Sequence, residues 1–236
     1  MESLSLQDAI AANLAEIRRR LVRSAERAGR RPSDVRLVAV SKTFPISHVL
    51  AAHAAGQWLF GENRVQEALE KIALLSDTPI EWHLVGHLQS NKARKAATSF
   101  ACIHSIDSVE LLRRVDGAAE EDGRQPELLI EVDLAGEPTK HGTAVDTLPA
   151  IFEAAAECRA VRVTGLMVLP PLMDDPEDAR PYFRRLREIC DELAGRGVPR
   201  SMLGELSMGM SHDFEIAVEE GATLVRVGTA IFGGRG

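Results

Sequence analysis

The sequence predicts an α/β fold, a single closed (β/α)8 barrel preceded by an extra N-terminal helix. Three observations predict it: short β-rich runs alternate with longer helical patterns, eight such runs fit within 236 residues, and no linker rich in Pro, Gly or Ser divides the chain. An open doubly wound sheet of this size usually has fewer strands. We therefore expect residues 1–236 to form one domain.

The first predicted element is an amphipathic helix that ends at Gly29. Ser5 and Asp8 resemble a capping box, and apolar residues recur downstream at helical spacing. Acidic residues interleave the arginines of this segment, which argues against a targeting peptide. No stretch of the chain approaches the roughly 18 uninterrupted apolar residues of a membrane span.

The predicted strands are short runs rich in β-branched and apolar residues, and helical patterns alternate with them. The strands are 36–40, 58–61, 81–85, 102–105, 127–134, 162–166, 202–207 and 224–227. The helical patterns are 47–55, 64–75, 90–98, 109–121, 148–158, 176–196 and 212–220. Two long irregular stretches, 136–142 and 169–176, follow strand ends, where we expect active-site loops.

Composition and charge favour a soluble, cytoplasmic protein with a small-molecule partner. The chain has 45% hydrophobic and 27% charged residues, and its formal net charge of -7 argues against nucleic-acid binding. Cys102, Cys158 and Cys190 are odd in number and lack the spacing of metal ligands. They predict reduced thiols, with no disulfide framework and no zinc site.

Lys42 closes the first predicted strand, where the working groups of a barrel gather. Its position at the end of a buried strand would help to desolvate the amine and favour its nucleophilic form. After strands seven and eight, Ser207, Gly228 and Thr229 supply hydroxyls and close backbone approach for a phosphate. A solvated surface lysine and an ordinary turn are the alternatives. Together, the lysine and the phosphate anchor suit pyridoxal 5′-phosphate (PLP), whose aldehyde condenses with an amine.

Arg226 lies on the eighth predicted strand, directly before the proposed phosphate loop. It could donate to the pyridine nitrogen of PLP, and a guanidinium cannot hand that nitrogen a proton. The ring would then remain a weak electron sink, unlike one that is paired with an aspartate. A salt bridge inside the barrel is the alternative role for Arg226.

Seven ordered motifs from about residue 35 to the end of the chain point to a known family. They are AVSKT at 39–43, FGENRVQE at 60–67, WH at 82–83 with LQSNK at 88–92, HSIDS at 104–108, GLM at 165–167, SMGMS at 207–211 and VRVGT at 225–229. Together they resemble the pyridoxal phosphate homeostasis proteins, also called the YggS/PROSC family.

The resemblance implies a TIM-type barrel similar to the N-terminal domain of alanine racemase, the fold-type III architecture of PLP proteins. Carried over by position, Lys42 would hold PLP covalently as a Schiff base and Arg226 would face the pyridine nitrogen. Ser207, Gly228 and Thr229 would hold the phosphate. Further residues of the cofactor pocket would be Asn63, Met167 and Met208.

Two positions depart from the family pattern. His87 stands where the family usually has proline, and a titratable side chain there could alter the pH response of the rim. Asp133 stands where the family usually has asparagine, which puts the amide contact of that position in doubt. Within the third predicted strand, we interpret His83 as a hydrogen-bonded core histidine rather than a general base.

The resemblance implies a protein that binds PLP, acts in its intracellular homeostasis and carries it to PLP-dependent apoenzymes, a role that needs no second catalytic base. Because no dimerising second domain is found, we expect a monomer, and because no second base is found, we expect no enzymatic activity. A racemase or decarboxylase on the same barrel is an alternative, although racemisation needs a second base. The single tyrosine, Tyr182, lies within a predicted helix. A third hypothesis is an aldolase-like barrel in which Lys42 forms a different imine without PLP. We favour the first.

Overall fold

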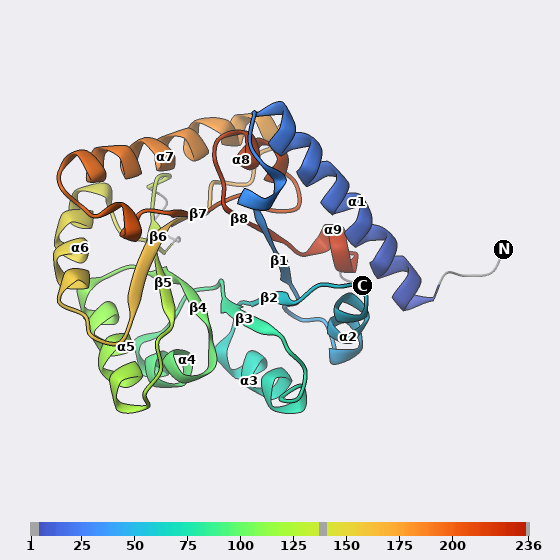
Figure 1. Cartoon of the computed structure of the whole chain (residues 1–236), viewed down its shortest axis with the longest axis horizontal. Coiled ribbons are helices and arrows are strands. Elements are labelled where there is room, and N and C mark those ends of the chain that lie inside the picture. The colour runs from blue at the N-terminus through green and yellow to red at the C-terminus, as the bar shows by residue number, and fades with distance from the viewer. Residues whose placement is uncertain (1–4, 137–140, 235–236) are drawn as a thin grey trace.

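The computed structural model describes residues 5–136 and 141–234. Eight parallel strands pair in chain order and close into a barrel, with β8 beside β1 (Figure 1). The predicted closed barrel is confirmed. The strands are β1 (Arg36–Val40), β2 (Leu59–Glu62), β3 (Glu81–Leu84), β4 (Cys102–Ile106), β5 (Glu127–Val132), β6 (Arg162–Val168), β7 (Glu205–Ser207) and β8 (Leu224–Val227).

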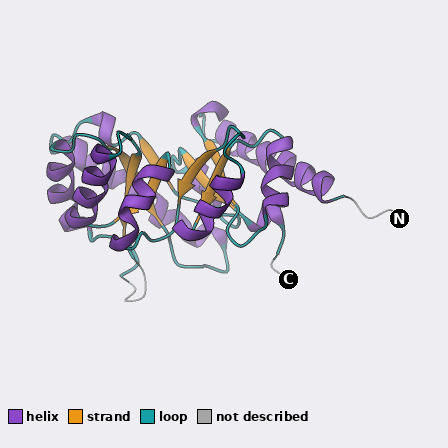
Figure 2. Cartoon of the chain, turned by 90° about the horizontal axis from the view of Figure 1, so that it is seen from below, coloured by secondary structure: helices purple, strands orange, loops and turns teal. Residues whose placement is uncertain are grey.

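Helices surround the strands, which lie between them in the view of Figure 2. They are α1 (Leu6–Arg27), α2 (Ile46–Ala54), α3 (Val65–Leu74), α4 (Ala93–Ser99), α5 (Val109–Glu121), α6 (Leu148–Ala156), α7 (Arg180–Gly195), α8 (Phe214–Glu219) and α9 (Thr229–Phe232). Short 3-10 helices are η1 (Pro32–Asp34), η2 (Ser90–Lys92), η3 (Val145–Thr147), η4 (Pro176–Ala179) and η5 (Arg200–Met202).

Several predicted strand boundaries differ from the structure by one to three residues, and two of these differences have a clear local cause. The strand predicted at 202–207 begins only at Glu205, because residues 200–202 form η5. The strand predicted at 127–134 ends at Val132. There the Asp133 carboxylate accepts hydrogen bonds from the backbone N–H groups of Ala135 and Gly136, at 2.9 Å each, and turns the chain. The predicted loop at 136–142 lies partly outside the described residues.

The predicted amphipathic helix is α1, which begins after the Ser5 cap. The Ser5 hydroxyl accepts a hydrogen bond from the backbone N–H of Asp8 at 3.2 Å. One face of α1 is buried and contacts α2, α8 and α9 (Figure 1), which places this helix across the first and last elements of the barrel. The buried apolar side chains of that face are Ile10, Leu14, Ile17, Leu21 and Ala25.

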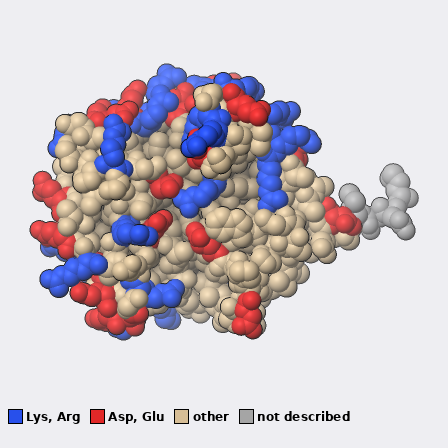
Figure 3. Space-filling view, viewed as in Figure 1, with Lys and Arg blue, Asp and Glu red and all other residues tan. Residues whose placement is uncertain are grey.

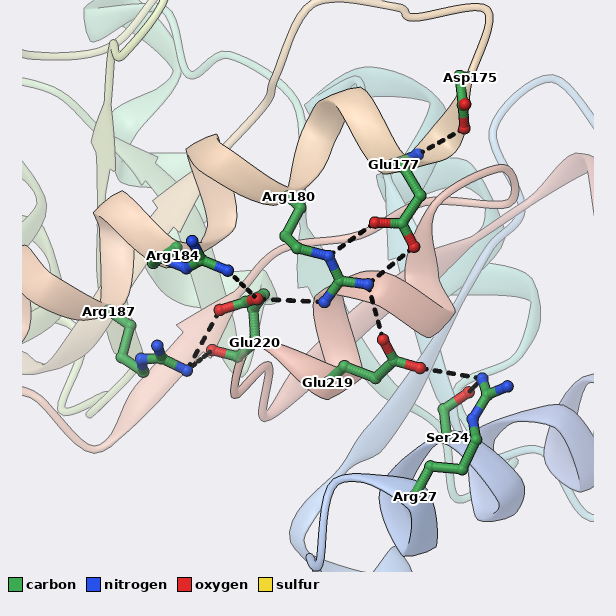
Figure 4. Close-up of polar contacts among 9 residues, drawn as sticks. All are labelled: Ser24, Arg27, Asp175, Glu177, Arg180, Arg184, Arg187, Glu219 and Glu220. Atoms are coloured by element: carbon green, nitrogen blue, oxygen red, sulfur yellow. Dashed lines mark hydrogen bonds and ion pairs between the residues drawn. The ribbon is translucent and has the colours of Figure 1, made fainter.

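An ion-pair network ties α1 to α7 and α8 (Figure 4). Glu219 lies 3.0 Å from Arg27 of α1 and 2.8 Å from Arg180 of α7. Glu220 is buried, and its carboxylate lies 3.1 Å from both Arg180 and Arg184. Since the buried carboxylate has several cationic partners, its charge is compensated.

The buried residues form two cores, one between the barrel and the helices and one inside the barrel. The apolar side chains inside the barrel are Val38, Val40, Leu59, Val85, Cys102, Leu129, Met167 and Leu224. On the face drawn in Figure 3, basic and acidic side chains are interspersed rather than gathered by sign. Within residues 5–136 and 141–234, no helix combines the length and the hydropathy that crossing a membrane requires.

Candidate cofactor site

Lys42 lies two residues beyond the end of β1, in a turn at the carboxyl end of the barrel, and is half-buried. The pairing of Ala39 with Val227 brings the ends of β1 and β8 to the same rim. Gly228 packs so closely there that a Cβ atom would lie 3.1 Å from the carbonyl oxygen of Val40. The sequence predicted that the ends of the first and last strands share one rim.

A buried ion pair lies behind the Lys42 turn. The Lys71 ammonium of α3 is 2.6 Å from the Glu62 carboxylate at the end of β2, and it donates to the Ser41 carbonyl oxygen at 2.8 Å. The Ser41 hydroxyl in turn donates to Glu62 at 2.7 Å. Burial raises the pKa of Glu62, although the hydrogen bonds from Lys71 and Ser41 oppose this rise. The peptide that precedes Lys42 is therefore fixed from within the wall.

The peptide that follows Lys42 is fixed by Glu67. Its carboxylate accepts from the backbone N–H of Thr43 at 2.6 Å and from the Lys71 ammonium at 2.9 Å. Burial alone would raise the pKa of Glu67, but the hydrogen bonds from Lys71 and Thr43 outweigh it and lower the pKa. Thr43 has a φ of 68°, a left-handed conformation that is costly for a β-branched residue. The hydrogen bonds of Glu67 to Thr43 and Lys71 were not predicted from the sequence.

The two C-terminal motifs meet at the same rim. The Ser211 hydroxyl accepts from the backbone N–H groups of Gly228 at 3.2 Å and Ala230 at 3.3 Å, and Arg226 N–H donates to the Gly209 carbonyl oxygen at 2.9 Å. Gly209 has a φ of 89°, and a Cβ atom there would lie 2.5 Å from that of Ala217. This position therefore requires glycine. Ser211 is a rim residue that the sequence analysis did not single out.

Thr229 begins α9 and is exposed at this rim. Gly228 lies against the carbonyl oxygen of Val40, two residues before Lys42, and the hydroxyl groups of Thr229 and Ser211 belong to the same loop. The predicted phosphate contacts of Gly228 and Thr229 stay predictions.

Arg226 is almost fully buried inside the barrel. Its guanidinium donates to the Ser207 hydroxyl at 2.5 Å and to the Val168 carbonyl oxygen, at the end of β6, at 2.9 Å. Burial lowers the pKa of Arg226 to about 10, and the negative charges of Asp213 and Glu131 oppose this shift. Arg226 therefore stays charged at neutral pH.

Ser207 is fully buried, and its hydroxyl lies between Arg226 and His104, with the His104 Nδ1 atom at 2.8 Å. The predicted phosphate contact of Ser207 stays a prediction, because the polar contacts of its hydroxyl within the described residues are to these two side chains.

The three remaining predicted pocket residues occupy different layers. Asn63 is half-buried after β2, and a Cβ atom on Gly86 would lie 2.4 Å from its carbonyl oxygen, so the loops after β2 and β3 touch. Met167 lies in the inner core of the barrel, whereas Met208 lies in the outer core against the helices. The side chain of Met208 is thus on the far side of the wall from that of Met167. Their cofactor contacts stay predictions.

The two positions that depart from the family pattern both lie on loops after strands. The His87 ring stacks on the His141 ring, with centroids 3.5 Å apart and planes at 9°. The His87 Nδ1 atom is 3.8 Å from the Asp107 carboxylate. Partial burial and the neighbouring His141 lower the pKa of His87, against the pull of Asp107. The carboxylate of Asp133, in contrast, caps its own turn.

His83 is a buried, hydrogen-bonded core histidine, which confirms its predicted role. Its partner His104 on β4 and the proximity of Cys102 were not predicted from the sequence. Ligand atoms of these three residues lie within 4.8 Å of one another. Because the residues come from two strands, their spacing along the sequence does not match a metal-binding motif. The signal that could have found it is the alternation of Cys102 and His104 on one strand, which turns both toward the same face.

Comparisons with known proteins agree with this architecture. Residues 7–236 match the profile of the family described as "Alanine racemase, N-terminal domain". A pyridoxal phosphate homeostasis protein of Aquifex aeolicus is 43% identical, covering 94% of this chain and 96% of the relative. One from Pseudomonas aeruginosa is 42% identical, covering 96% of each chain.

Among solved structures, PipY of Synechococcus elongatus with PLP bound is 44% identical, with a TM-score of 0.85, and covers 95% of this chain and 100% of its own. Alanine racemase of Streptomyces lavendulae shares the fold, with a TM-score of 0.69 at 22% identity, covering 97% of this chain and 58% of the racemase.

Proposed function

Because this chain belongs to the alanine racemase N-terminal domain family, and within it to the pyridoxal phosphate homeostasis proteins, we propose that it binds PLP and acts in PLP homeostasis. The resemblance predicted from the sequence motifs is thereby confirmed. The observation that carries the proposal is the convergence of Lys42, Arg226 and the Gly228 loop at one end of the barrel.

The residues at this rim fit a phosphorylated aromatic aldehyde. Gly228 has no side chain, so the backbone of its loop can lie close to other groups. A Cβ atom at this position would lie only 3.1 Å from the Val40 carbonyl oxygen. Thr229 and Ser211 add hydroxyl groups to that loop. The buried cation of Arg226 lies inside the barrel below the rim, where it can serve a ring nitrogen.

We assign covalent attachment to Lys42. PLP supplies an aldehyde that a lysine amine can condense with to form a Schiff base. The half-buried position of Lys42 and the fixed peptides on either side of it support this role, because they aim the side chain from a rigid turn. Gly228 and Thr229 hold the phosphate, Arg226 faces the pyridine nitrogen, and Asn63 and Met167 border the ring.

Holding the cofactor, rather than turning over a substrate, is the activity we propose. A racemase needs a proton donor and acceptor on each face of the substrate. The single tyrosine of the sequence, Tyr182, lies on α7 in the outer layer of helices. This placement supports binding without racemisation, because the tyrosine lies away from the strand ends that carry Lys42 and Arg226. The function proposed is that of a carrier, which binds PLP reversibly as a monomer in the cytoplasm and passes it to PLP-dependent apoenzymes.

A titration tests the proposal. Purified protein is mixed with PLP, and the absorbance of the Schiff base is followed to saturation. We expect one equivalent to bind, the Lys42→Ala variant to form no adduct at that site, and the Lys92→Ala variant to bind as the original chain does. A protein that shows no Schiff-base absorbance beyond that of free PLP at saturation contradicts the proposed function.

A further inference from the structure

A chain of hydrogen bonds runs through the inside of the barrel from β3 to β8. The Glu81 carboxylate contacts His83 Nε2 at 2.9 Å, and His83 Nδ1 contacts His104 Nε2 at 2.8 Å. His104 Nδ1 contacts the Ser207 hydroxyl at 2.8 Å, and that hydroxyl accepts from Arg226 at 2.5 Å. The middle members are buried, whereas the side chain of Glu81 is 34% exposed. The chain thus links the N-terminal end of the barrel to Arg226.

The two ends of this chain fix its direction. A hydrogen bond from His83 lowers the pKa of Glu81, so the carboxylate is ionised and can only accept. Burial lowers the pKa of His83, so this ring is neutral and has one N–H group. That N–H group must face Glu81, which leaves His83 Nδ1 as an acceptor.

The same reasoning continues to the other end. His83 Nδ1 requires a donor, so His104 must carry its proton on Nε2 and accept on Nδ1. Burial lowers the pKa of His104 well below its usual range, so this ring is also neutral. The Ser207 hydroxyl must therefore donate to His104, and it accepts from Arg226, which can only donate. Every donor then points toward Glu81.

A metal ion is the competing explanation for the same residues. Cys102 lies beside the two histidines, and their outer nitrogens have the oxygen partners that metal-bound histidines usually have. However, two nitrogens at about 2.05 Å from a tetrahedral ion are about 3.3 Å apart. The inner nitrogens of His83 and His104 are only 2.8 Å apart, which is a direct hydrogen bond.

We propose that Glu81, His83, His104 and Ser207 form a directional chain that positions Arg226 for the cofactor ring, and that Ser207 serves this chain rather than the phosphate. The inference rests on the proposed function, since it deepens the role of Arg226 at the same site. Ser207 is a positioning residue here, because it acts through the guanidinium that it accepts from.

The proposed direction of the hydrogen bonds requires one particular tautomer of each histidine, and the tautomers can be measured without cofactor. In the cofactor-free protein labelled with 15N, long-range nitrogen–proton correlations distinguish a protonated Nε2 from a protonated Nδ1. We expect both His83 and His104 to be neutral with the proton on Nε2. A His104 ring that carries its proton on Nδ1 overturns the direction of the chain, whether or not the protein binds PLP.

The role of Ser207 is separated from phosphate binding by comparing PLP with pyridoxal, which lacks the phosphate. If Ser207 positions Arg226, Ser207→Ala weakens the binding of both compounds by the same factor, about 3- to 10-fold, the size of one lost hydrogen bond. If it weakens PLP binding and leaves pyridoxal binding unchanged, Ser207 contacts the phosphate and the proposal is wrong.

The matched control is Ser24→Ala, which removes another fully buried serine hydroxyl, on α1. This variant should bind PLP and pyridoxal as the original chain does. Titration with Zn²⁺ tests the competing explanation. If one equivalent of Zn²⁺ binds and the nitrogen–proton correlations of His83 and His104 are lost, these residues form a metal site and the proposed hydrogen-bond chain is wrong. Failure of the proposed function looks different, because the original chain would then form no Schiff base while the tautomers stayed as predicted.

Discussion

Glu62 and Lys71 form a buried ion pair, 2.6 Å between Oε1 and Nζ, directly behind the turn that carries Lys42. The same ammonium reaches the Ser41 carbonyl oxygen, and Glu67 joins it to the Thr43 N–H. The conformation of the Lys42 turn thus depends on charges that lie between the barrel and α3 rather than in the pocket.

Removal of Lys71 tests this dependence. Lys71→Met leaves the Glu62 carboxylate buried without its cation, and its Oε2 atom already has no hydrogen-bond partner among the described residues. We expect the free energy of unfolding to fall by about 3 to 5 kcal/mol, measured by urea denaturation of the cofactor-free protein. The double variant Lys71→Met with Glu62→Gln should regain part of this loss. A loss below about 1 kcal/mol, the scale of an exposed pair, would show that the pair is not buried in solution.

Thr43 offers a stabilising substitution. Its φ of 68° costs a β-branched residue about 1 to 2 kcal/mol, whereas asparagine tolerates this conformation better. Thr43→Asn keeps the N–H that Glu67 accepts, so we expect a gain of about 0.5 to 1 kcal/mol in the free energy of unfolding. Thr43→Val, which keeps the branching, is the control and should show no gain. Destabilisation by asparagine would contradict the left-handed turn.

Glu131 should give the stability of the cofactor-free protein a pH dependence near neutrality. Burial raises its pKa from 4.5 to about 7, while Arg226 opposes the shift and Asp107 and Asp133 add to it. Between these values the folded state holds a proton that the unfolded state has released, so stability falls as pH rises from about 4.5 to 7. The fall is at most about 3 kcal/mol.

The Glu131→Gln variant cannot titrate at this position. Its stability relative to the original chain should therefore increase across the same window and stay constant above pH 7. Unfolding free energies measured at intervals between pH 4.5 and 8 check this. A stability difference that does not change with pH would mean that Glu131 has an ordinary pKa.

Arg226→Ala should weaken cofactor retention by about 1 to 3 kcal/mol, through the loss of a charge-assisted hydrogen bond. Arg226→Lys should restore only part of the affinity, because lysine lacks the fork that reaches both Ser207 and the Val168 carbonyl oxygen. Equilibrium titration with PLP measures both variants. An affinity equal to that of the original chain would remove Arg226 from the ring contact.

The sequence predicted the barrel because its hydrophobic runs and crossover helices are local patterns that also determine the topology. It placed Lys42, Arg226 and Gly228 at strand ends, and the rule that barrel strands converge at one rim then brought them together. Element boundaries were less predictable where a side chain bonds to nearby backbone, as Asp133 does after β5.

The long-range polar contacts could not be predicted from the sequence. Lysine is a residue type that is seldom buried, yet Lys71 is buried against Glu62 from a neighbouring strand. The contact of His104 with Ser207 joins residues 103 positions apart, and its existence depends on which face of each strand turns inward. Such pairings depend on register across the closed sheet, which periodicity does not specify.

Peptide mapping after borohydride reduction shows whether Lys42 is the residue that holds PLP. Reduction of the protein with bound PLP makes the Schiff base permanent, and mass spectrometry of the digest then locates the modified lysine. We expect one modified peptide, the one that contains Lys42. Modification at Lys71, Lys92, Lys95 or Lys140 with Lys42 unmodified, or no modification at all, would contradict it.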